Sequence, residues 1–151
     1  MNEIDALYQD ALKHLAQTAH GGGRLPAAMN GKVGEARLDN PLCGDRVSMQ
    51  VTLGRGHIDA LAHETRGCLL CRAAASAIGL RAPGLDPAAI EGVADSLEGS
   101  LKHGAAPPAA WPELAVFAPA RDYPGRHGCI LLPFRALLAA LRNVPAPEIS
   151  T

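Results

Sequence analysis

The chain has 151 residues, of which 48% are hydrophobic, so its length suits one domain with a single buried core. Lys and Arg number 14 against 15 Asp and Glu, and only one Trp, two Tyr and two Phe occur, which disfavours nucleic-acid binding. We expect one soluble, cytoplasmic domain over residues 1–151 without a membrane partner, because no run of 18 apolar residues and no basic leader occurs. Four cysteines are too few for a secreted disulfide scaffold, which favours thiol or metal chemistry.

The first part of the chain predicts one helix and one short strand. Apolar residues recur three and four positions apart over residues 4–17, which is the spacing of an amphipathic helix. Gly21–Gly23 and Pro26 then end regular structure. Gly31 and Gly34 flank the start of a short strand predicted over residues 33–38.

Alternating apolar and polar residues predict a β-hairpin over residues 45–62, with its turn at 54–56. Its apolar residues share one face in a single register of the two strands. Extending that register outward pairs Cys43 with Cys68, so we expect both thiols together at the open end of the hairpin. The pairs that define the register are Leu53 with Ile58, Val51 with Ala60, and Met49 with Ala62.

Three helices are predicted in the second half. An Ala-rich segment predicts the first over 68–80, and an N-cap Asp followed by Pro predicts the second over 87–98. The proline-rich residues 103–125 predict a loop with at most one helical turn. Pro133 is tolerated only in the first turn of a helix, so Cys129 should lie at or just before the start of the last one. These elements predict an α+β fold, with a small antiparallel sheet of about three strands packed against helices.

Two segments at the open end of the hairpin carry residues suited to chemistry. Gly44 lets the backbone turn after Cys43, so Cys43 and Asp45 can point at one ion. Cys68 begins a helix, and the positive end of the helix dipole favours the thiolate. Metal binding and nucleophilic attack both need that form of the cysteine.

These motifs resemble the IscU/SufU/NifU N-terminal family of iron–sulfur cluster assembly proteins. The resemblance runs from about residue 33 to 141 and rests on Asn-Pro-Leu-Cys-Gly-Asp at 40–45, on Gly67-Cys68 at a helix start, and on Cys129 before a C-terminal helix. Within the family, the long segment between the second and third cysteines is similar to the SufU branch. Tyr-Pro-Gly-Arg-His-Gly-Cys at 123–129 resembles the Pro-x-Arg-x-x-Cys segment of that branch, and Gly128 stands where the IscU branch has histidine.

The resemblance implies that Cys43, Asp45, Cys68 and Cys129 hold zinc, iron or a [2Fe-2S] cluster, with Arg126 as a nearby cation. Three thiolates suit zinc or iron, while the carboxylate is a weaker and displaceable partner. The resemblance also implies that a pyridoxal-phosphate cysteine desulfurase supplies sulfur as a persulfide, with Cys43 as the predicted acceptor. Recipient apo iron–sulfur proteins or other assembly factors would be further partners.

Several roles stay open on the sequence alone. The chain is expected to act either as a scaffold for [2Fe-2S] clusters or as a zinc-dependent, sulfurtransferase-like accessory protein of the desulfurase, and a structural zinc module is the alternative. An unrelated thiol enzyme is disfavoured, because no histidine is placed beside a cysteine as a base. Cys71 is either a packing residue, the favoured interpretation, or a backup ligand or persulfide relay, whereas His127 is either a solvated loop residue, again favoured, or a fourth ligand.

Overall fold

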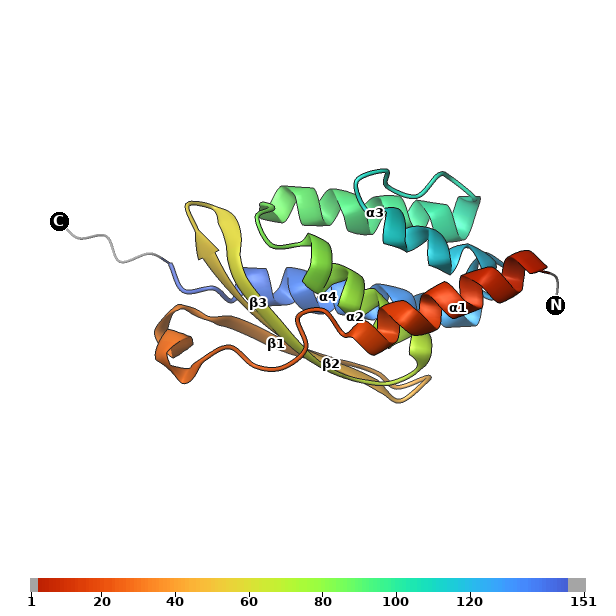
Figure 1. The fold of residues 1–151 in the computed structure, drawn as a ribbon. Helices are drawn as coiled ribbons and strands as arrows, with labels where there is room; N and C mark the ends of the chain where they lie inside the picture. Colours follow the sequence, from red (N-terminus) through yellow and green to blue (C-terminus); the bar gives the residue numbers. More distant parts are fainter. Residues whose placement is uncertain (1–2, 147–151) are drawn as a thin grey trace.

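A computed structural model describes residues 3–146, with the backbone alone for residues 3–8 and residue 30. Both ends of the predicted 1–151 domain, residues 1–2 and 147–151, lie outside the described residues. A three-stranded antiparallel sheet carries helices on one face, which confirms the predicted α+β class (Figure 1). In chain order the elements are α1 (Glu3–Thr18), η1 (Ala27–Lys32), β1 (Gly34–Asn40), β2 (Asp45–Gly54), β3 (His57–Arg66), α2 (Leu69–Arg81), α3 (Pro87–His103), η2 (Pro112–Asp122), η3 (Pro124–Arg126) and α4 (His127–Arg142), where η marks a 3-10 helix.

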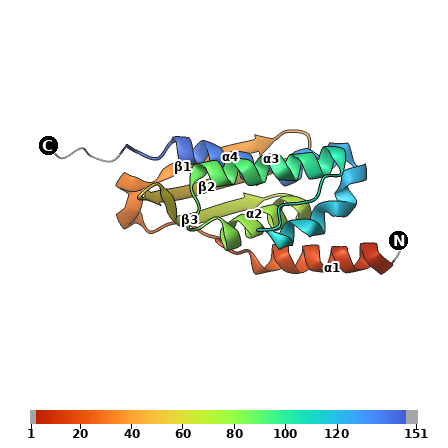
Figure 2. The same ribbon diagram turned by 90° about the horizontal axis from the view of Figure 1, so that it is seen from above.

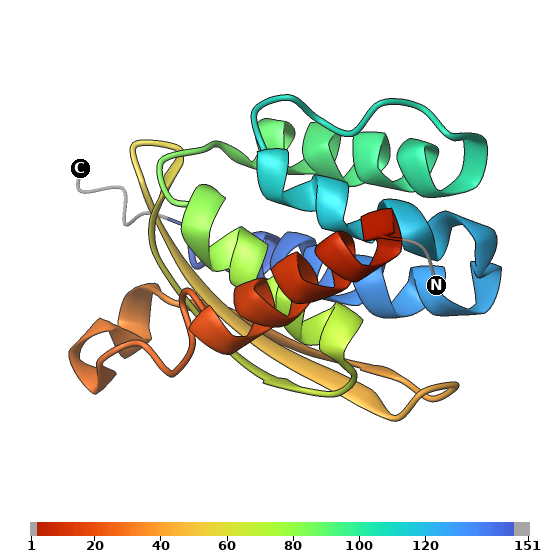
Figure 3. The same ribbon diagram turned by 45° about the vertical axis from the view of Figure 1, so that its right-hand side comes forward.

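The strands lie in the order β1-β2-β3, and the helices cover the sheet in two layers. The inner layer consists of α2, which contacts β3, and of α4, which contacts β1 and β2. The outer layer consists of α3, which packs on α4, and of α1, which packs on α2 (Figures 2 and 3). None of the helices within residues 3–146 combines the length and the hydropathy that a membrane crossing requires.

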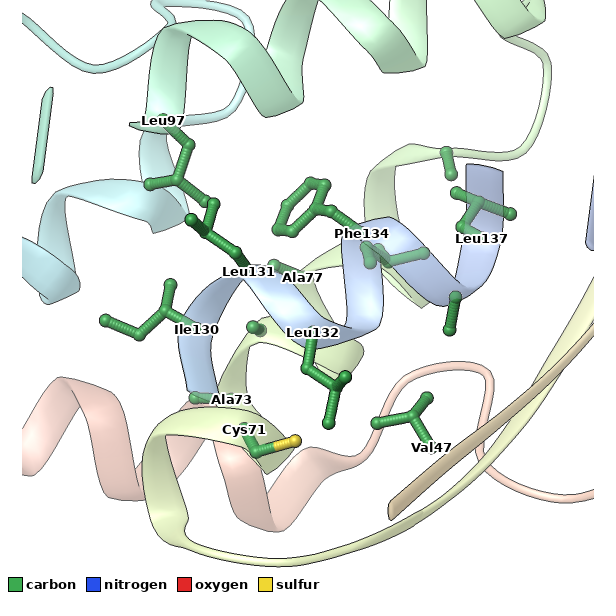
Figure 4. Close-up of a cluster of buried hydrophobic side chains, with 14 of the residues drawn as sticks. Val47, Cys71, Ala73, Ala77, Leu97, Ile130, Leu131, Leu132, Phe134 and Leu137 are labelled. Carbon is green, nitrogen blue, oxygen red and sulfur yellow. The ribbon is translucent and has the colours of Figure 1, made fainter. Parts of the chain in front are cut away.

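The core lies between the sheet and the inner helices. The alternation of β2 points Val47, Met49 and Val51 inward, and all three have no exposed surface. Against them α4 buries a continuous apolar face that includes Phe134 and Leu137 (Figure 4). Each large side chain buried in this way contributes roughly 1.5–3 kcal/mol to folding. The packing of this shared core fixes the distance between α4 and the sheet.

The register of the β2–β3 hairpin differs from the prediction. A bulge between Thr52 and Leu53 shifts the pairing by one residue along the rest of the hairpin. Thr52 Oγ1 accepts the Ala60 N–H at 3.1 Å, so a side chain partners a donor at the irregularity. The alternation of apolar and polar residues in the sequence does not reveal that a side-chain oxygen replaces a backbone carbonyl as the acceptor here. The predicted pair Leu53 with Ile58 is therefore confirmed, but Val51 pairs with Leu61 rather than Ala60, and Met49 pairs with His63 rather than Ala62.

The proline-rich segment forms more regular structure than the predicted loop. Residues Pro112–Asp122 form a 3-10 helix, because Trp111 and Phe117 enter the core and hold the chain against it. The ring centroids of Trp111 and Phe134 lie 5.8 Å apart. Tertiary burial thus overrides the local tendency of the prolines to break structure.

The last helix begins two residues before Cys129, so the prediction for its start is wrong. The 3-10 turn Pro124–Arg126 leads directly into α4, and Pro133 lies inside the helix rather than in its first turn. Pro133 has no N–H, so the Cys129 carbonyl lacks its usual helical partner. The burial of Pro133 within the apolar face of α4 offsets this loss.

A buried histidine fastens the segment after α1 to the sheet. The backbone of His63 accepts a hydrogen bond from Gly23 N and donates one to Gly21 O, each at 2.9 Å. Its Nε2 lies 2.7 Å from the His20 carbonyl, and its Nδ1 lies 3.0 Å from Thr65 Oγ1. A carbonyl only accepts, so Nε2 carries the proton. Burial lowers the pKa of His63, and the bond to His20 opposes this effect.

The lowered pKa of His63 predicts a pH dependence of folding. The unfolded chain binds a proton at this position more readily than the folded chain, so stability should fall as the pH drops below the ordinary histidine pKa of about 6.5. We expect His63→Gln to flatten this fall, measured by urea unfolding of the metal-free chain between pH 8 and 5. His57→Gln, at an exposed histidine of the same strand, should follow the unmodified chain. Parallel curves for His63→Gln and the unmodified chain would contradict the prediction.

Candidate metal centre

Cys43 lies in the four-residue turn 41–44 that connects β1 to β2. Gly44 has a φ of 69°, a left-handed conformation that favours glycine. The turn leaves Cys43 exposed, whereas Asp45, the first residue of β2, is only 1% exposed. The predicted chelating loop is therefore a β-hairpin turn with one accessible thiol and one buried carboxylate.

Cys129 in the first turn of α4 meets this turn from the helical side of the sheet. The sulfur atoms of Cys43 and Cys129 lie 2.6 Å apart. Among the described residues, Cys43, Asp45 and Cys129 each offer one ligand atom, and these atoms all lie within 4.8 Å of one another. Three of the four predicted ligands are therefore close enough to share one ion.

Cys68 joins the group through Asp45. It is the N-cap residue of α2, and its backbone N–H donates to Asp45 Oδ1 at 2.9 Å. Its thiol donates to the other carboxylate oxygen at 3.5 Å. The predicted direct pairing of Cys43 with Cys68 is wrong, because the β2–β3 ladder ends at Arg46 and Arg66 and Cys43 lies beyond it, in the turn toward β1.

Gly67, which the sequence places at the start of a helix, is also a residue of the site. A Cβ atom at this position would lie 2.3 Å from Asp45 Oδ1. Only glycine therefore lets the carboxylate reach the N-terminus of α2. No sequence pattern indicates this contact, because it joins residues from the starts of two elements that the hairpin brings together.

Cys129 is the proposed ligand whose thiol holds its proton firmly. Burial is the main cause that raises the pKa of Cys129, and hydrogen bonds with Cys43 and Asp45 add to it. The pKa of Arg126 is also raised, first by a hydrogen bond with Cys68 and then by its electrostatic interaction with the same side chain. A cation bound among these groups would favour the thiolate forms, so metal uptake would release protons.

Cys71 and His127 stand outside this group of ligand atoms. Cys71 is fully buried and belongs to the core, as in the favoured packing interpretation (Figure 4). Burial is the main cause that raises its pKa. His127 is also buried, with Nε2 3.0 Å from the Ala120 carbonyl and 3.2 Å from the Arg121 carbonyl. The prediction of a solvated histidine is wrong, and this ring nitrogen is engaged by backbone rather than by the centre.

No family model matches the chain, and no curated relative does. Several solved structures are similar in fold to this chain. A NifU-like N-terminal protein from Brucella abortus has a TM-score of 0.83 at 25% identity, over 94% of this chain and 96% of that one. A protein of unassigned function has a TM-score of 0.79 at 25% identity, over 91% and 98%. The resemblance to the IscU/SufU/NifU family is confirmed.

A third structure agrees with the IscU/SufU/NifU fold. It is a protein from the thermophile Fervidobacterium islandicum AW-1, provisionally assigned as an iron–sulfur cluster assembly scaffold of the SUF system. Its TM-score is 0.69 at 21% identity, over 87% of this chain and 94% of that one, which supports the fold alone. NifU-like and SufU proteins both occur among these structures, so membership of the SufU branch stays a prediction.

The contact of Gly67 with Asp45 predicts a sensitive position. We expect Gly67→Ala to lower the free energy of unfolding by about 1–3 kcal/mol, because the methyl group displaces the carboxylate from the Cys68 N–H. Urea unfolding of the metal-free chain measures this effect. Gly99→Ala is the matched control, since a Cβ there meets nothing within 4 Å. Equal stability of Gly67→Ala and the unmodified chain would contradict the assigned role.

Proposed function

We propose that this chain is an iron–sulfur cluster biogenesis protein in which Cys43, Asp45, Cys68 and Cys129 bind the metal. The observation that carries the proposal is the convergence of Cys43, Asp45 and Cys129 within 4.8 Å, with Cys68 on the same carboxylate. The chain also resembles a NifU-like N-terminal protein and a SUF-system scaffold in fold. We favour a scaffold role in assembling and transferring [2Fe-2S] clusters.

The donor atoms fit zinc, iron or an iron–sulfur cluster. Thiolates are preferred by these metals, whereas a carboxylate is a harder and more easily displaced ligand. Asp45 Oδ1 is held by the Cys68 N–H, so Oδ2 is the oxygen available to the metal once the Cys68 thiol, which donates to it, loses its proton. Four anionic ligands around one divalent ion leave two negative charges, and Arg126 beside Cys68 offsets part of this excess.

A second role, persulfide acceptance, is favoured by the exposure of Cys43. Cys129 is buried, whereas Cys43 lies on an exposed turn that the active cysteine of a desulfurase could approach. The Cys43 thiolate would attack the terminal sulfur of the donor persulfide, the donor S–S bond would break, and the donor cysteine would leave as a thiolate. The Cys43 persulfide then carries sulfur toward a recipient apo protein. Bound zinc would supply an environment that keeps the ligand cysteines deprotonated.

The alternative of a purely structural zinc module agrees less well with the accessible turn. Structural zinc sites are closed and usually have four Cys or His ligands. Here one ligand is a carboxylate and another, Cys43, is exposed. The cysteines are free, and the cytoplasm predicted from the sequence would keep them so.

Metal analysis after purification without oxygen tests the proposed centre. A scaffold should contain about two irons and two acid-labile sulfides per chain, whereas a persulfide acceptor should contain about one tight zinc. We expect Cys43→Ser to reduce this content by about tenfold or more, and Cys71→Ala to retain it, because Cys71 packs in the core. A chain that binds neither metal nor cluster would overturn the proposal.

A desulfurase assay separates the two roles. If Cys43 accepts sulfur, adding the chain should raise desulfurase turnover, and Cys43→Ser should abolish the increase. Mass spectrometry should then find the persulfide on the peptide that contains Cys43. Unchanged turnover with a metal-loaded chain would exclude sulfur acceptance and leave the scaffold role.

A further inference from the structure

Asn40 accepts the backbone hydrogen bonds of residues 41–44, the turn that carries Cys43 and is called the Cys43 turn below. The turn has three N–H donors, at Leu42, Cys43 and Gly44, since Pro41 has none. The Leu42 N–H donates to Asn40 Oδ1 at 3.1 Å. The Asn40 carbonyl accepts the Gly44 N–H at 2.8 Å and the Cys43 N–H at 3.3 Å. All three backbone N–H groups of the turn therefore donate to Asn40.

The same side chain lies against the first turn of α4. A Cβ atom on Gly128 would lie 3.1 Å from Asn40 Nδ2, closer than ordinary van der Waals contact. Gly128 has no positive φ, so its backbone conformation does not call for glycine. Glycine inside a helix costs about 1 kcal/mol relative to alanine. Gly128 leaves space for the Asn40 amide, which a methyl group at position 128 would push aside by a few tenths of an ångström.

We propose that Asn40 is a positioning residue that sets the approach of Cys43 to Cys129, with Gly128 as its matched partner. This inference rests on the proposed metal centre. Asn40 fixes the backbone that carries Cys43, and its amide packs on the residue that precedes Cys129. The two thiols come from elements far apart in the sequence, and Asn40 binds the backbone of the first element and lies beside Gly128 of the second. Residues that orient metal ligands in this way control affinity without binding the ion.

The metal-free chain allows a test that needs no bound metal. In a glutathione redox buffer, Cys43 displaces one glutathione from glutathione disulfide, and Cys129 then displaces the second, leaving a Cys43–Cys129 disulfide and two glutathione thiols. Mass spectrometry gives the ratio of this disulfide to the mixed disulfide. We expect Asn40→Ala and Gly128→Ala to lower the ratio by about tenfold, because the thiols lose their alignment. Asn40→Asp keeps the acceptor for the Leu42 N–H, so its disulfide ratio should lie between those of Asn40→Ala and the unmodified chain.

Matched controls separate positioning from general destabilisation. Gly92→Ala makes the same change in a helix where a Cβ meets nothing within 4 Å, and Asn143→Ala removes another amide that bonds a backbone carbonyl, that of Glu35. Both should leave the disulfide ratio within about twofold of the unmodified chain. Circular dichroism confirms that each variant is folded. If Asn40→Ala does not fold, Gly128→Ala and Asn40→Asp decide the outcome.

Metal binding supplies the second measurement. Zinc affinity from chelator competition should fall by about 10- to 100-fold in Asn40→Ala and Gly128→Ala, and the thiolate-to-cobalt absorption of the Co²⁺-loaded chain should weaken. Unchanged disulfide ratios in these variants would overturn the positioning role while the metal centre stands. An unmodified chain that binds no metal would overturn the proposed function, and the disulfide ratio would still decide whether Asn40 positions the thiols.

Discussion

The candidate centre depends on one buried carboxylate at the start of a helix. Asp45 is almost completely buried, and burying a carboxylate is costly unless hydrogen bonds replace its water. The Cys68 N–H at the N-terminus of α2 provides such a bond, and the helix dipole favours negative charge there. The contact exists because Gly67 has no side chain. It joins the end of the sheet to α2 and places two predicted ligands side by side before any metal binds.

The third element of the centre, α4, lies along β1 with close contacts at both of its ends. Near the end of α4, a Cβ atom on Gly34 of β1 would lie 2.2 Å from the Ala140 carbonyl. Near its start, Gly128 faces the amide of Asn40, the last residue of β1. Missing side chains at these two glycines let helix and strand approach closely. The position of Cys129 relative to the Cys43 turn follows from this alignment of α4 with β1.

The outer parts of the molecule support this arrangement without entering the centre. The chain between α1 and η1 is bound to β3 through His63, and the segment between α3 and α4 is held in the core by Trp111. His127, the first residue of α4, bonds carbonyls of η2 through its ring nitrogen. Residues that looked chemically active in isolation therefore have structural partners, and the reactive groups concentrate at one end of the sheet.

Local periodicity and turn residues determined much of this protein from the sequence alone. They indicated the strands β2 and β3, the helices α1, α2 and α3, the α+β class, and a turn that lets Cys43 and Asp45 face one point. Such features depend on side chains a few residues apart, which a linear sequence displays directly. The resemblance to a known family then supplied Cys129 as a further ligand.

Only the tertiary structure decided which thiol meets which. The bulge at Thr52 changed the hairpin register, because a side chain took over a backbone hydrogen bond that alternation cannot reveal. Cys43 meets Cys129 because the packing of α4 along β1 brings together residues 86 positions apart. The roles of Gly67, Asn40 and Gly128 likewise depend on close approaches between separate elements. Those distances arise from the packing of the core as a whole, and no short stretch of sequence contains them.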